Sequence, residues 1–158
     1  MEKNDGVTII VFSGDMDKVM AAFNIAIGAA AAGKETNMFF TFWGIKAIQK
    51  GNLTGQGLFG RMMGLLNRGG INTIGPSRFN FGGIGRWMFK QMMKSHNITP
   101  LEELRQTAID LGVKLLPCEM SMQVMEIDVD NLIDEVENSC GVATMLEKAF
   151  HSKATLFV

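Results

Sequence analysis

Short apolar runs alternate along the chain with stretches in which apolar residues recur at helical spacing. Residues 7–12 (VTIIVF) are mostly β-branched and predict a strand that is buried on both faces. From position 19 to position 27 apolar residues recur on one helical face, which predicts a helix. We expect Asp15 or Asp17 to cap this helix and Gly33 to end it.

The same order of signals returns later in the chain. Residues 36–42 form a second apolar run, which predicts a second buried strand. After position 98, Thr99 is expected to cap a helix, Pro100 to take its first position and Gly112 to end it. A strand at 113–116 follows directly, so this stretch reads as one helix-strand unit.

The C-terminal part of the chain is predicted to alternate in the same way. It holds a polar helix near 130–133, a weak short strand near 135–137, a helix at 142–150 and a last strand at 154–158. Strands that alternate with helices indicate a parallel sheet. We therefore predict an α/β fold, a flavodoxin-like three-layer sandwich with a five-stranded parallel sheet and helices on both faces.

Residues 51–97 interrupt this alternation. They hold 11 of the 18 glycines, together with five methionines and five aromatic residues. A structureless loop of this length is unusual inside a compact domain. We predict a helical insertion after the second strand, with amphipathic helices at about 56–66 and 84–94, in a single domain that spans residues 1–158.

Charge separates the insertion from the rest of the chain. None of the 16 acidic residues lies between Glu35 and Glu102, whereas eight of the 15 basic residues do. The rest of the chain therefore carries seven basic residues and all 16 acidic residues. A basic, methionine-rich surface is typical of an oligomer interface, a partner-docking site or peripheral contact with an anionic membrane. Because it lacks a pattern of base-stacking aromatic residues, nucleic-acid binding is disfavoured.

Chain length and cysteine content indicate how the fold is stabilised and in which compartment the protein is expected to work. A chain of 158 residues buries a sizeable core without disulfides, and two cysteines are typical of a reducing compartment. The charged opening MEKNDGV and the short apolar runs predict neither a signal peptide nor a membrane-spanning helix. We expect a cytoplasmic protein, with the insertion as a possible point of membrane association.

Several motifs are present only in part. The stretch GQGLFG at 55–60 matches G-x-G-x-x-G, but it does not follow the first strand and no acid occurs until Glu102. The loop SGDMD after the first strand carries acids that would repel a flavin phosphate. His96 and His151 stand alone, and the two cysteines lie 22 residues apart. The residues therefore predict no nucleotide, flavin or metal site and no bound cofactor.

Cys118 lies in the stretch LLPCEMSM, directly after the strand predicted at 113–116. In a doubly wound sheet, ligands bind beyond the carboxyl ends of the strands. A helix that begins after Cys118 would favour the thiolate through its dipole, whereas the charge of Glu119 opposes it. Free cysteines also serve as small buried apolar residues, and this alternative stays open on the residues alone.

Cys140 follows the weak strand predicted at 135–137. If that strand neighbours the strand before Cys118, both sulfur atoms lie on one edge of the sheet. A role as a second, resolving thiol and a role in packing are both consistent with this position, and packing is favoured. Met120 and Met122 are expected to fill the core or to form an apolar rim around the thiol.

Four stretches together resemble the DsrE/DsrF-like sulfur-relay family, and within it the larger DsrE-type sulfurtransferases that are also described as peroxiredoxin-like. They are VTIIVFSGDMDKVMAAFNIAIGAAAAGKE, FFTFWGIKAI, the Gly/Met-rich insertion, and LGVKLLPCEMSMQVM with the later GVATML. The stretch around the cysteine is the most specific of the four. The resemblance covers essentially the whole chain, although smaller members have a short connection where this chain carries residues 51–97.

The resemblance implies both a fold and a function. It implies a compact α/β sheet, homo-oligomers that are trimers or hexamers, and sulfur donor and acceptor proteins as partners. It also implies that a cysteine after a central strand accepts sulfane sulfur as a persulfide, and by position this cysteine is Cys118. Cys140 lies outside the family pattern, so a mechanism with one cysteine is expected.

Overall fold

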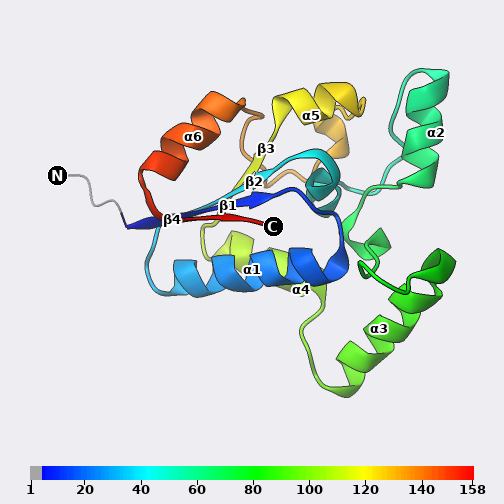
Figure 1. Cartoon of the computed structure of the whole chain (residues 1–158), viewed down its shortest axis with the longest axis horizontal. Coiled ribbons are helices and arrows are strands. Elements are labelled where there is room, and N and C mark those ends of the chain that lie inside the picture. The colour runs from blue at the N-terminus through cyan, green and yellow to red at the C-terminus, as the bar shows by residue number, and fades with distance from the viewer. Residues whose placement is uncertain (1–4) are drawn as a thin grey trace.

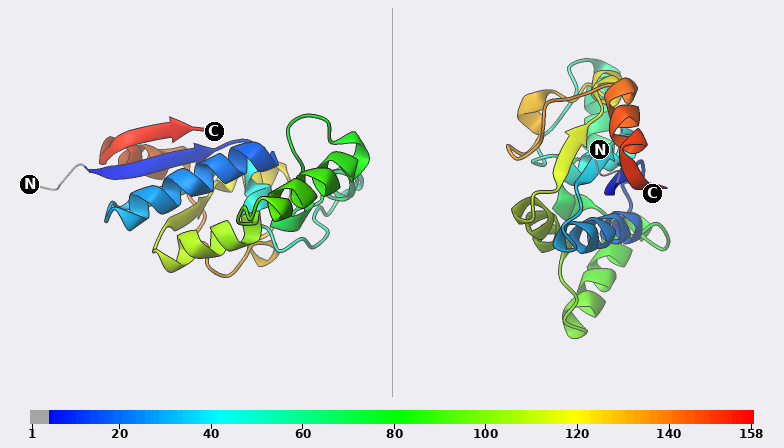
Figure 2. Two further views of the ribbon diagram at one scale, coloured as in Figure 1. Left: turned by 90° about the horizontal axis from the view of Figure 1, so that it is seen from below. Right: turned by 90° about the vertical axis from the view of Figure 1, so that its left-hand side faces the viewer.

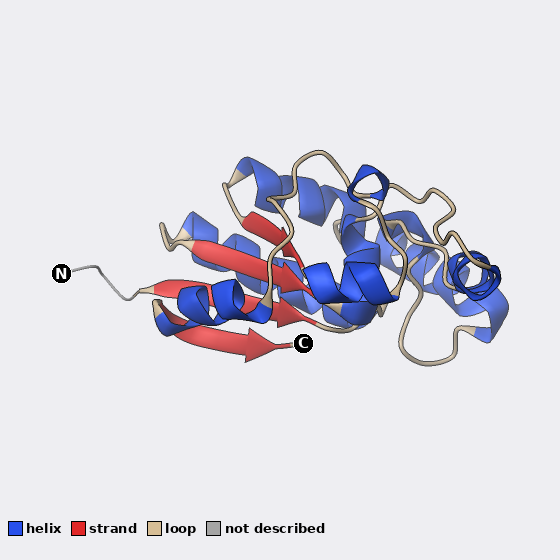
Figure 3. Ribbon diagram, turned by 90° about the horizontal axis from the view of Figure 1, so that it is seen from above, coloured by secondary structure: helices blue, strands red, loops and turns tan. Residues whose placement is uncertain are grey.

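The computed structural model describes residues 5–158, and the charged residues 1–4 of the N-terminal stretch lie outside this range. Within it, four parallel strands form one sheet in the order β3-β2-β1-β4 (Figures 1 and 3). The strands are β1 (Gly6–Val11), β2 (Thr36–Phe40), β3 (Lys114–Pro117) and β4 (Ser152–Phe157). Because the strands are parallel, their carboxyl ends meet at one end of the sheet.

The predicted fifth strand at 135–137 is wrong. This stretch does run beside β3, where the N–H groups of Glu137 and Cys140 donate to the carbonyl oxygens of Leu115 (2.9 Å) and Pro117 (3.0 Å). Only an isolated bridge between Cys118 and Cys140 forms, however. The local sequence DEVENS is almost entirely charged or polar, so it lacks the apolar side chains that would hold an edge strand on the sheet.

The strand order also differs from the predicted flavodoxin-like order, in which β1 lies between β2 and β3. Here β1 lies between β2 and β4, and β3 pairs with β2 at the edge of the sheet. Apolar periodicity shows that a strand is buried but does not show which strand it pairs with. The expectation of an α/β fold with a parallel sheet is confirmed, whereas the number and order of the strands are corrected.

Helices cover both faces of the sheet (Figures 1 and 2). The helices α1 (Met16–Ala31) and α4 (Leu101–Asp110) lie on one face, and α5 (Glu119–Val124) and α6 (Val142–Phe150) lie on the other. The larger core cluster lies between the sheet and the first pair, where the rings of Phe23 and Phe40 pack with centroids 6.2 Å apart. Burial of each such side chain contributes about 1.5–3 kcal/mol to folding.

The helix ends follow the sequence signals in part. Gly33 and Gly112 adopt φ values of 73° and 79° directly after α1 and α4, a left-handed conformation that glycine adopts without strain. Asp15 occupies the N-cap position of α1, but its side chain makes no capping hydrogen bond. Pro100 is the N-cap of α4 and not its first helical residue.

The second strand ends earlier than predicted, at Phe40 and not at residue 42. Phe42 has a φ of 45°, and the chain turns there into a 3₁₀ helix, η1 (Phe42–Ile48). The turn brings Gly44 against β1, where its N–H donates to the carbonyl oxygen of Phe12 at 2.9 Å. A Cβ at position 44 would overlap the carbonyl oxygen of Val11, so the close approach requires glycine.

The insertion contains both predicted helices, α2 (Leu58–Leu66) and α3 (Ile84–Ser95), with two short 3₁₀ turns, η2 (Ile71–Thr73) and η3 (Phe81–Gly83), between them. Both helices lie beyond the carboxyl ends of the strands (Figure 1). The apolar side chains of Ile71, Ile74 and Met93 nevertheless belong to the main core. The insertion is therefore built into the fold at its base.

The remaining C-terminal elements agree with the pattern in outline. A short 3₁₀ turn, η4 (Val129–Asn131), stands where a polar helix was predicted near 130–133, and α6 and β4 lie where expected. Within residues 5–158, no helix combines the length and the apolar character needed to cross a membrane.

Candidate functional site

The carboxyl end of the sheet brings three polar residues close to strand ends. Ser13 follows β1, Thr41 follows β2 and Cys118 follows β3. The hydroxyl groups of Thr41 and Ser121 are buried and lie 2.8 Å apart in a hydrogen bond, which ties the end of β2 to α5. The sequence carries no signal for this contact, because the two hydroxyls are 80 residues apart in the chain.

Cys118 lies between β3 and α5, as the sequence predicts. Its N–H donates to the carbonyl oxygen of Phe40 (2.9 Å), and its own carbonyl accepts from the N–H of Met122 (3.0 Å). The residue is only 1% exposed and packs with Phe39 and Met145 in a small second cluster on the α6 face. The short α5, with Glu119 in its first turn, offers little dipole to stabilise a thiolate.

Cys140 lies beside Cys118, without the strand at 135–137 on which the sequence argument depended. A parallel bridge pairs the two residues, and the N–H of Glu119 donates to the carbonyl oxygen of Cys140 at 3.1 Å. Both cysteines are free, and Cys140 is partly exposed. Burial raises the pKa of the Cys140 thiol, and the nearby charges of Cys118 and Glu119 add to this effect while Lys148 opposes it.

A pocket of about 450 Å³ is lined by sequence neighbours of the two cysteines, although neither cysteine lines it. Glu119 and Ser139, each adjacent in sequence to one of the cysteines, line it together with residues of α5 and of the segment that follows. Glu126 and Asp128 give its wall two further carboxylates. The wall of this pocket is therefore acidic, in contrast to the basic insertion.

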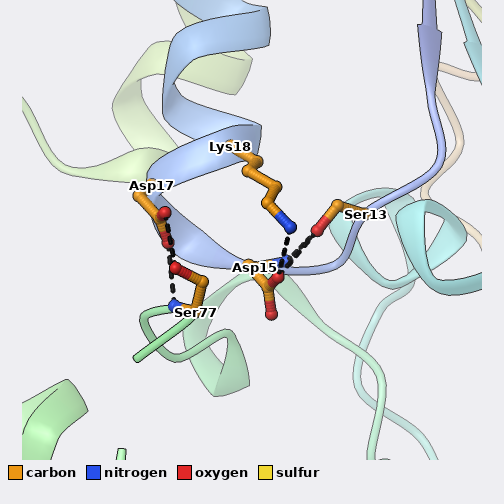
Figure 4. A network of polar contacts seen from close by, with 5 residues as sticks. All are labelled: Ser13, Asp15, Asp17, Lys18 and Ser77. Atoms are coloured by element: carbon orange, nitrogen blue, oxygen red, sulfur yellow. Dashed lines mark hydrogen bonds and ion pairs between the residues drawn. The ribbon is translucent and has the colours of Figure 1, made fainter. Parts of the chain in front are cut away.

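A separate group of polar contacts lies at the start of α1 (Figure 4). The carboxylate of Asp15 accepts hydrogen bonds from Ser13 Oγ (2.9 Å) and Lys18 Nζ (3.1 Å). Asp17 accepts from both the N–H (2.8 Å) and the Oγ (2.7 Å) of Ser77. Burial raises the pKa of Asp17, but the bonds from Ser77 outweigh burial and lower it. The two hydrogen bonds between Ser77 and Asp17 connect the insertion to α1.

The GQGLFG stretch forms the N-terminus of α2. The N–H groups of Gln56 and Gly57 donate to one carboxylate oxygen of Glu126, at 2.6 and 3.2 Å. The two hydrogen bonds hold the pKa of Glu126 below its ordinary value. The N–H groups that would cradle a phosphate in a nucleotide site are therefore used by a carboxylate of the same chain, 70 residues from Gln56.

The two histidines lie at the ends of different helices, His96 after α3 and His151 after α6. The Nδ1 of His151 makes a hydrogen bond of 2.8 Å with the carbonyl oxygen of Glu147. Across the described range, no three His, Cys, Asp or Glu side chains are grouped so that they could hold a metal ion.

Comparison with known families agrees with this geometry. The sequence model of the DsrE/DsrF/DrsH-like family matches residues 3–157. The chain belongs to the DsrE/DsrF/DrsH-like family. The resemblance inferred from four stretches of the sequence is confirmed at the level of the family.

Two relatives match this DsrE-like chain over nearly its whole length. It is 39% identical over 159 residues to the uncharacterized protein YrkE of Bacillus subtilis, with 99% of each chain covered. It is 30% identical over 155 residues to the sulfur carrier protein DsrE2 of Allochromatium vinosum, with 96% of this chain and 97% of the relative covered. The insertion is therefore spanned by both alignments.

Two solved structures share the fold. The ychN protein of E. coli superposes with a TM-score of 0.61 and covers 98% of this chain, with 99% of its own length aligned. The protein MTH1491 of Methanobacterium thermoautotrophicum, of unknown function, superposes with a TM-score of 0.54 over the same shares. Both are 11% identical to this DsrE-like chain, so they support its fold alone.

Proposed function

We propose that this DsrE-like chain is a sulfur carrier and sulfurtransferase that accepts sulfane sulfur as a persulfide on Cys118. The observation that carries the proposal is the place of Cys118 at the carboxyl end of β3, with Cys140 bridged beside it. Family membership supports the same chemistry, because a relative 30% identical to this chain is a sulfur carrier protein.

The reaction is a thiol exchange in two steps. The Cys118 thiolate attacks the terminal sulfur of a donor persulfide, R–S–SH, so that a new S–S bond forms and the donor leaves as the thiolate R–S⁻. Cys118–S–SH then loses its terminal sulfur in the same way to the thiolate of an acceptor, and Cys118 returns to the thiolate. Each step conserves charge and needs neither a cofactor nor an acid-base pair.

Access to Cys118 requires local opening, because the thiol is 1% exposed. The cover on the α6 face is thin, because Met145 is the one buried residue that α6 contributes among its described side chains. Elements that bury few apolar side chains open at low free energy. We infer that a donor reaches Cys118 by displacing α6 and the neighbouring segment at 138–141.

Cys140 is not the attacking group in this proposal. Burial raises the pKa of its thiol, which disfavours the thiolate that attacks a donor. It packs beside Cys118 in the second cluster.

Donor and acceptor proteins are expected to contact the acidic pocket, which borders the segment at 138–141 through Ser139. Glu119, Glu126 and Asp128 line its wall, so a partner with a basic surface fits it best. The assembly into trimers or hexamers stays a prediction from the family resemblance. Light scattering of the purified chain measures it.

Intact-mass spectrometry after treatment with inorganic polysulfide tests the site. The wild-type chain should gain about 32 Da, the mass of one sulfur atom, and lose it on addition of a reductant. The adduct should be absent in Cys118→Ser and present in the matched variant Cys140→Ser. An adduct that persists in Cys118→Ser, or that maps to Cys140 alone, would show that the assignment of Cys118 is wrong.

Glu119 is proposed to restrain the thiol until a partner covers its charge. In Glu119→Gln the loss of the adjacent negative charge should speed the loading of Cys118 several-fold at pH 7. An equal loading rate in both proteins would remove this role and leave the sulfur-carrier proposal intact.

A further inference from the structure

The helix α2 carries its apolar face outward. A surface helix normally turns its apolar stripe toward the core. In α2, Leu58, Phe59 and Leu66 are 81%, 76% and 77% exposed, and the other large apolar side chains of the helix are exposed as well. Gly60 and Gly64, at helical spacing on the opposite face, are turned toward the body of the protein.

Close contacts fix this orientation. A Cβ at position 60 would overlap the carboxylate of Glu126, and a Cβ at position 64 would overlap the carbonyl oxygen of Thr54. The hydrogen bonds that the N–H groups of Gln56 and Gly57 donate to the Glu126 carboxylate hold the same face inward. A rotation that buried the leucines would break these bonds and push large side chains into the space that only glycine fits.

The helix α3 presents a second exposed apolar stripe. Met93 packs into the core and Phe89 packs against it, whereas Ile84, Met88 and Met92 are exposed on the other side. Trp87 is 65% exposed at the border of this stripe. The exposed surface continues in the preceding loop, where Phe79 and Phe81 stand with ring centroids 6.1 Å apart.

Cationic residues lie on the same elements as these apolar stripes. Arg61 lies on α2, Lys90 and Lys94 lie on α3, and Arg78 lies in the loop between the helices. Across residues 5–158, the side chains of Arg61, Arg78 and Lys94 make no hydrogen bond or ion pair with another residue. The insertion has no acid of its own to neutralise them.

The exposed apolar side chains and the cations of the insertion together favour one kind of binding partner. A second copy that docked by the same surface would bring its cations against these cations, which like-charge repulsion opposes. A bilayer with anionic headgroups matches both features at once, since apolar and aromatic side chains enter the acyl boundary while Lys and Arg pair with the headgroups.

We propose that α2, α3 and the Phe79–Phe81 loop form a peripheral docking surface for anionic phospholipid membranes. The two helices lie in the interface and do not cross the bilayer. Because the surface lies beyond the carboxyl ends of the strands, docking places the cysteine end of the sheet toward the membrane (Figure 1). The proposal does not rest on sulfur transfer.

Vesicle flotation of the full chain tests the proposal. The wild-type protein should float with vesicles of phosphatidylcholine and phosphatidylglycerol and should remain behind with phosphatidylcholine alone. Raised salt should reduce the bound fraction. Deletion of residues 51–97 is unsuitable here, because it would remove Ile71, Ile74 and Met93 from the core.

Two pairs of matched variants separate the contributions. Arg61→Gln with Lys94→Gln should weaken partition roughly 30-fold, whereas the control Lys148→Gln with Lys153→Gln removes the same charge outside the insertion and should have little effect. Phe59→Ser with Leu66→Ser should abolish flotation, whereas the exposed control pair Ile25→Ser with Val124→Ser should not. Unchanged thermal unfolding in all four proteins would show that the fold is retained.

Three outcomes would overturn the proposal. The first is the absence of wild-type flotation with anionic vesicles at low salt. The second is equal flotation with and without phosphatidylglycerol, which would remove the role of the cations. The third is a wild-type oligomer that Phe59→Ser with Leu66→Ser converts to monomers without any vesicle binding, which would assign this face to a second copy of the chain.

Discussion

The sheet and the insertion use similar apolar residues in opposite ways. In β2, Phe39 and Phe40 are buried on the two faces of the sheet, whereas in α2, Phe59 and Leu66 point into solvent. The difference follows from where small residues allow the backbone to come close. In α2 the glycines are turned inward, so the large side chains have only the outer face available.

The largest difference between the two regions is expected when one large side chain in each is truncated and the free energy of unfolding is measured. Phe40→Ala should lower the free energy of unfolding by about 3–5 kcal/mol, because it leaves a cavity in the main core. Leu66→Ala should change it by less than about 0.5 kcal/mol, because Leu66 is largely exposed. Urea unfolding of both variants measures the contrast, and equal losses would show that α2 is buried in solution.

A glycine substitution tests the inward face of α2 directly. Gly64→Ala should destabilise the protein by about 1–3 kcal/mol, because the added Cβ meets the carbonyl oxygen of Thr54. Gly28→Ala in α1 is the matched control: its Cβ meets nothing within 4 Å, so it should stabilise by about 0.5–1 kcal/mol. A stabilising Gly64→Ala would mean that α2 does not pack by its glycine face.

Within the sheet region, the side chain of Met145 packs over Cys118 and is expected to limit its reaction with reagents. Met145→Ala removes the buried side chain through which α6 covers the thiol, so alkylation of Cys118 should be faster by about tenfold. The exposed neighbour Leu146→Ala serves as the control and should leave the rate unchanged within about twofold. Peptide mapping with a maleimide reagent measures both, and equal rates in all proteins would place the opening elsewhere.

The smallest effect is expected from pH, at the contact between the two regions. The pKa of Glu126 is lowered in the folded protein, so its bonds to α2 contribute stability above the unfolded pKa and are lost as pH falls through the folded pKa. Hydrogen exchange of α2 should therefore rise, beyond the intrinsic change, in mildly to strongly acidic solution. In Glu126→Gln the exchange of α2 should already be raised at pH 7, with no further acid-dependent step.

Much of the fold could be read from the sequence because its signals are local. The β-branched run of β1, the glycines that end α1 and α4, and the two helices of the insertion all follow from spacing and turn chemistry. The strand order could not be read in this way, since pairing depends on contacts between distant segments. The alternation of elements predicts a strand at 135–137, but this charged stretch runs beside β3 without joining the sheet.

The sequence predicts that Cys118 lies at the end of a strand, but it does not predict that the residue is buried. The step from strand to proline to Cys118 places the thiol at a strand end from the sequence alone. Its burial beneath Met145 depends on how a helix 24 residues later packs, which no local pattern reveals. The contact of Glu126 with Gln56 is hidden for the same reason, because 70 residues separate the two partners.

The burial of Cys118 has a consequence for its chemical lifetime. Oxidation of cysteine to sulfenic and higher acids requires a thiolate that small oxidants can reach, and the fully oxidised forms are irreversible. A thiol that is 1% exposed is shielded from peroxide in bulk solvent between encounters with other proteins. In the proposed sulfur carrier, the packing that delays reaction with a donor would also protect Cys118 from irreversible oxidation.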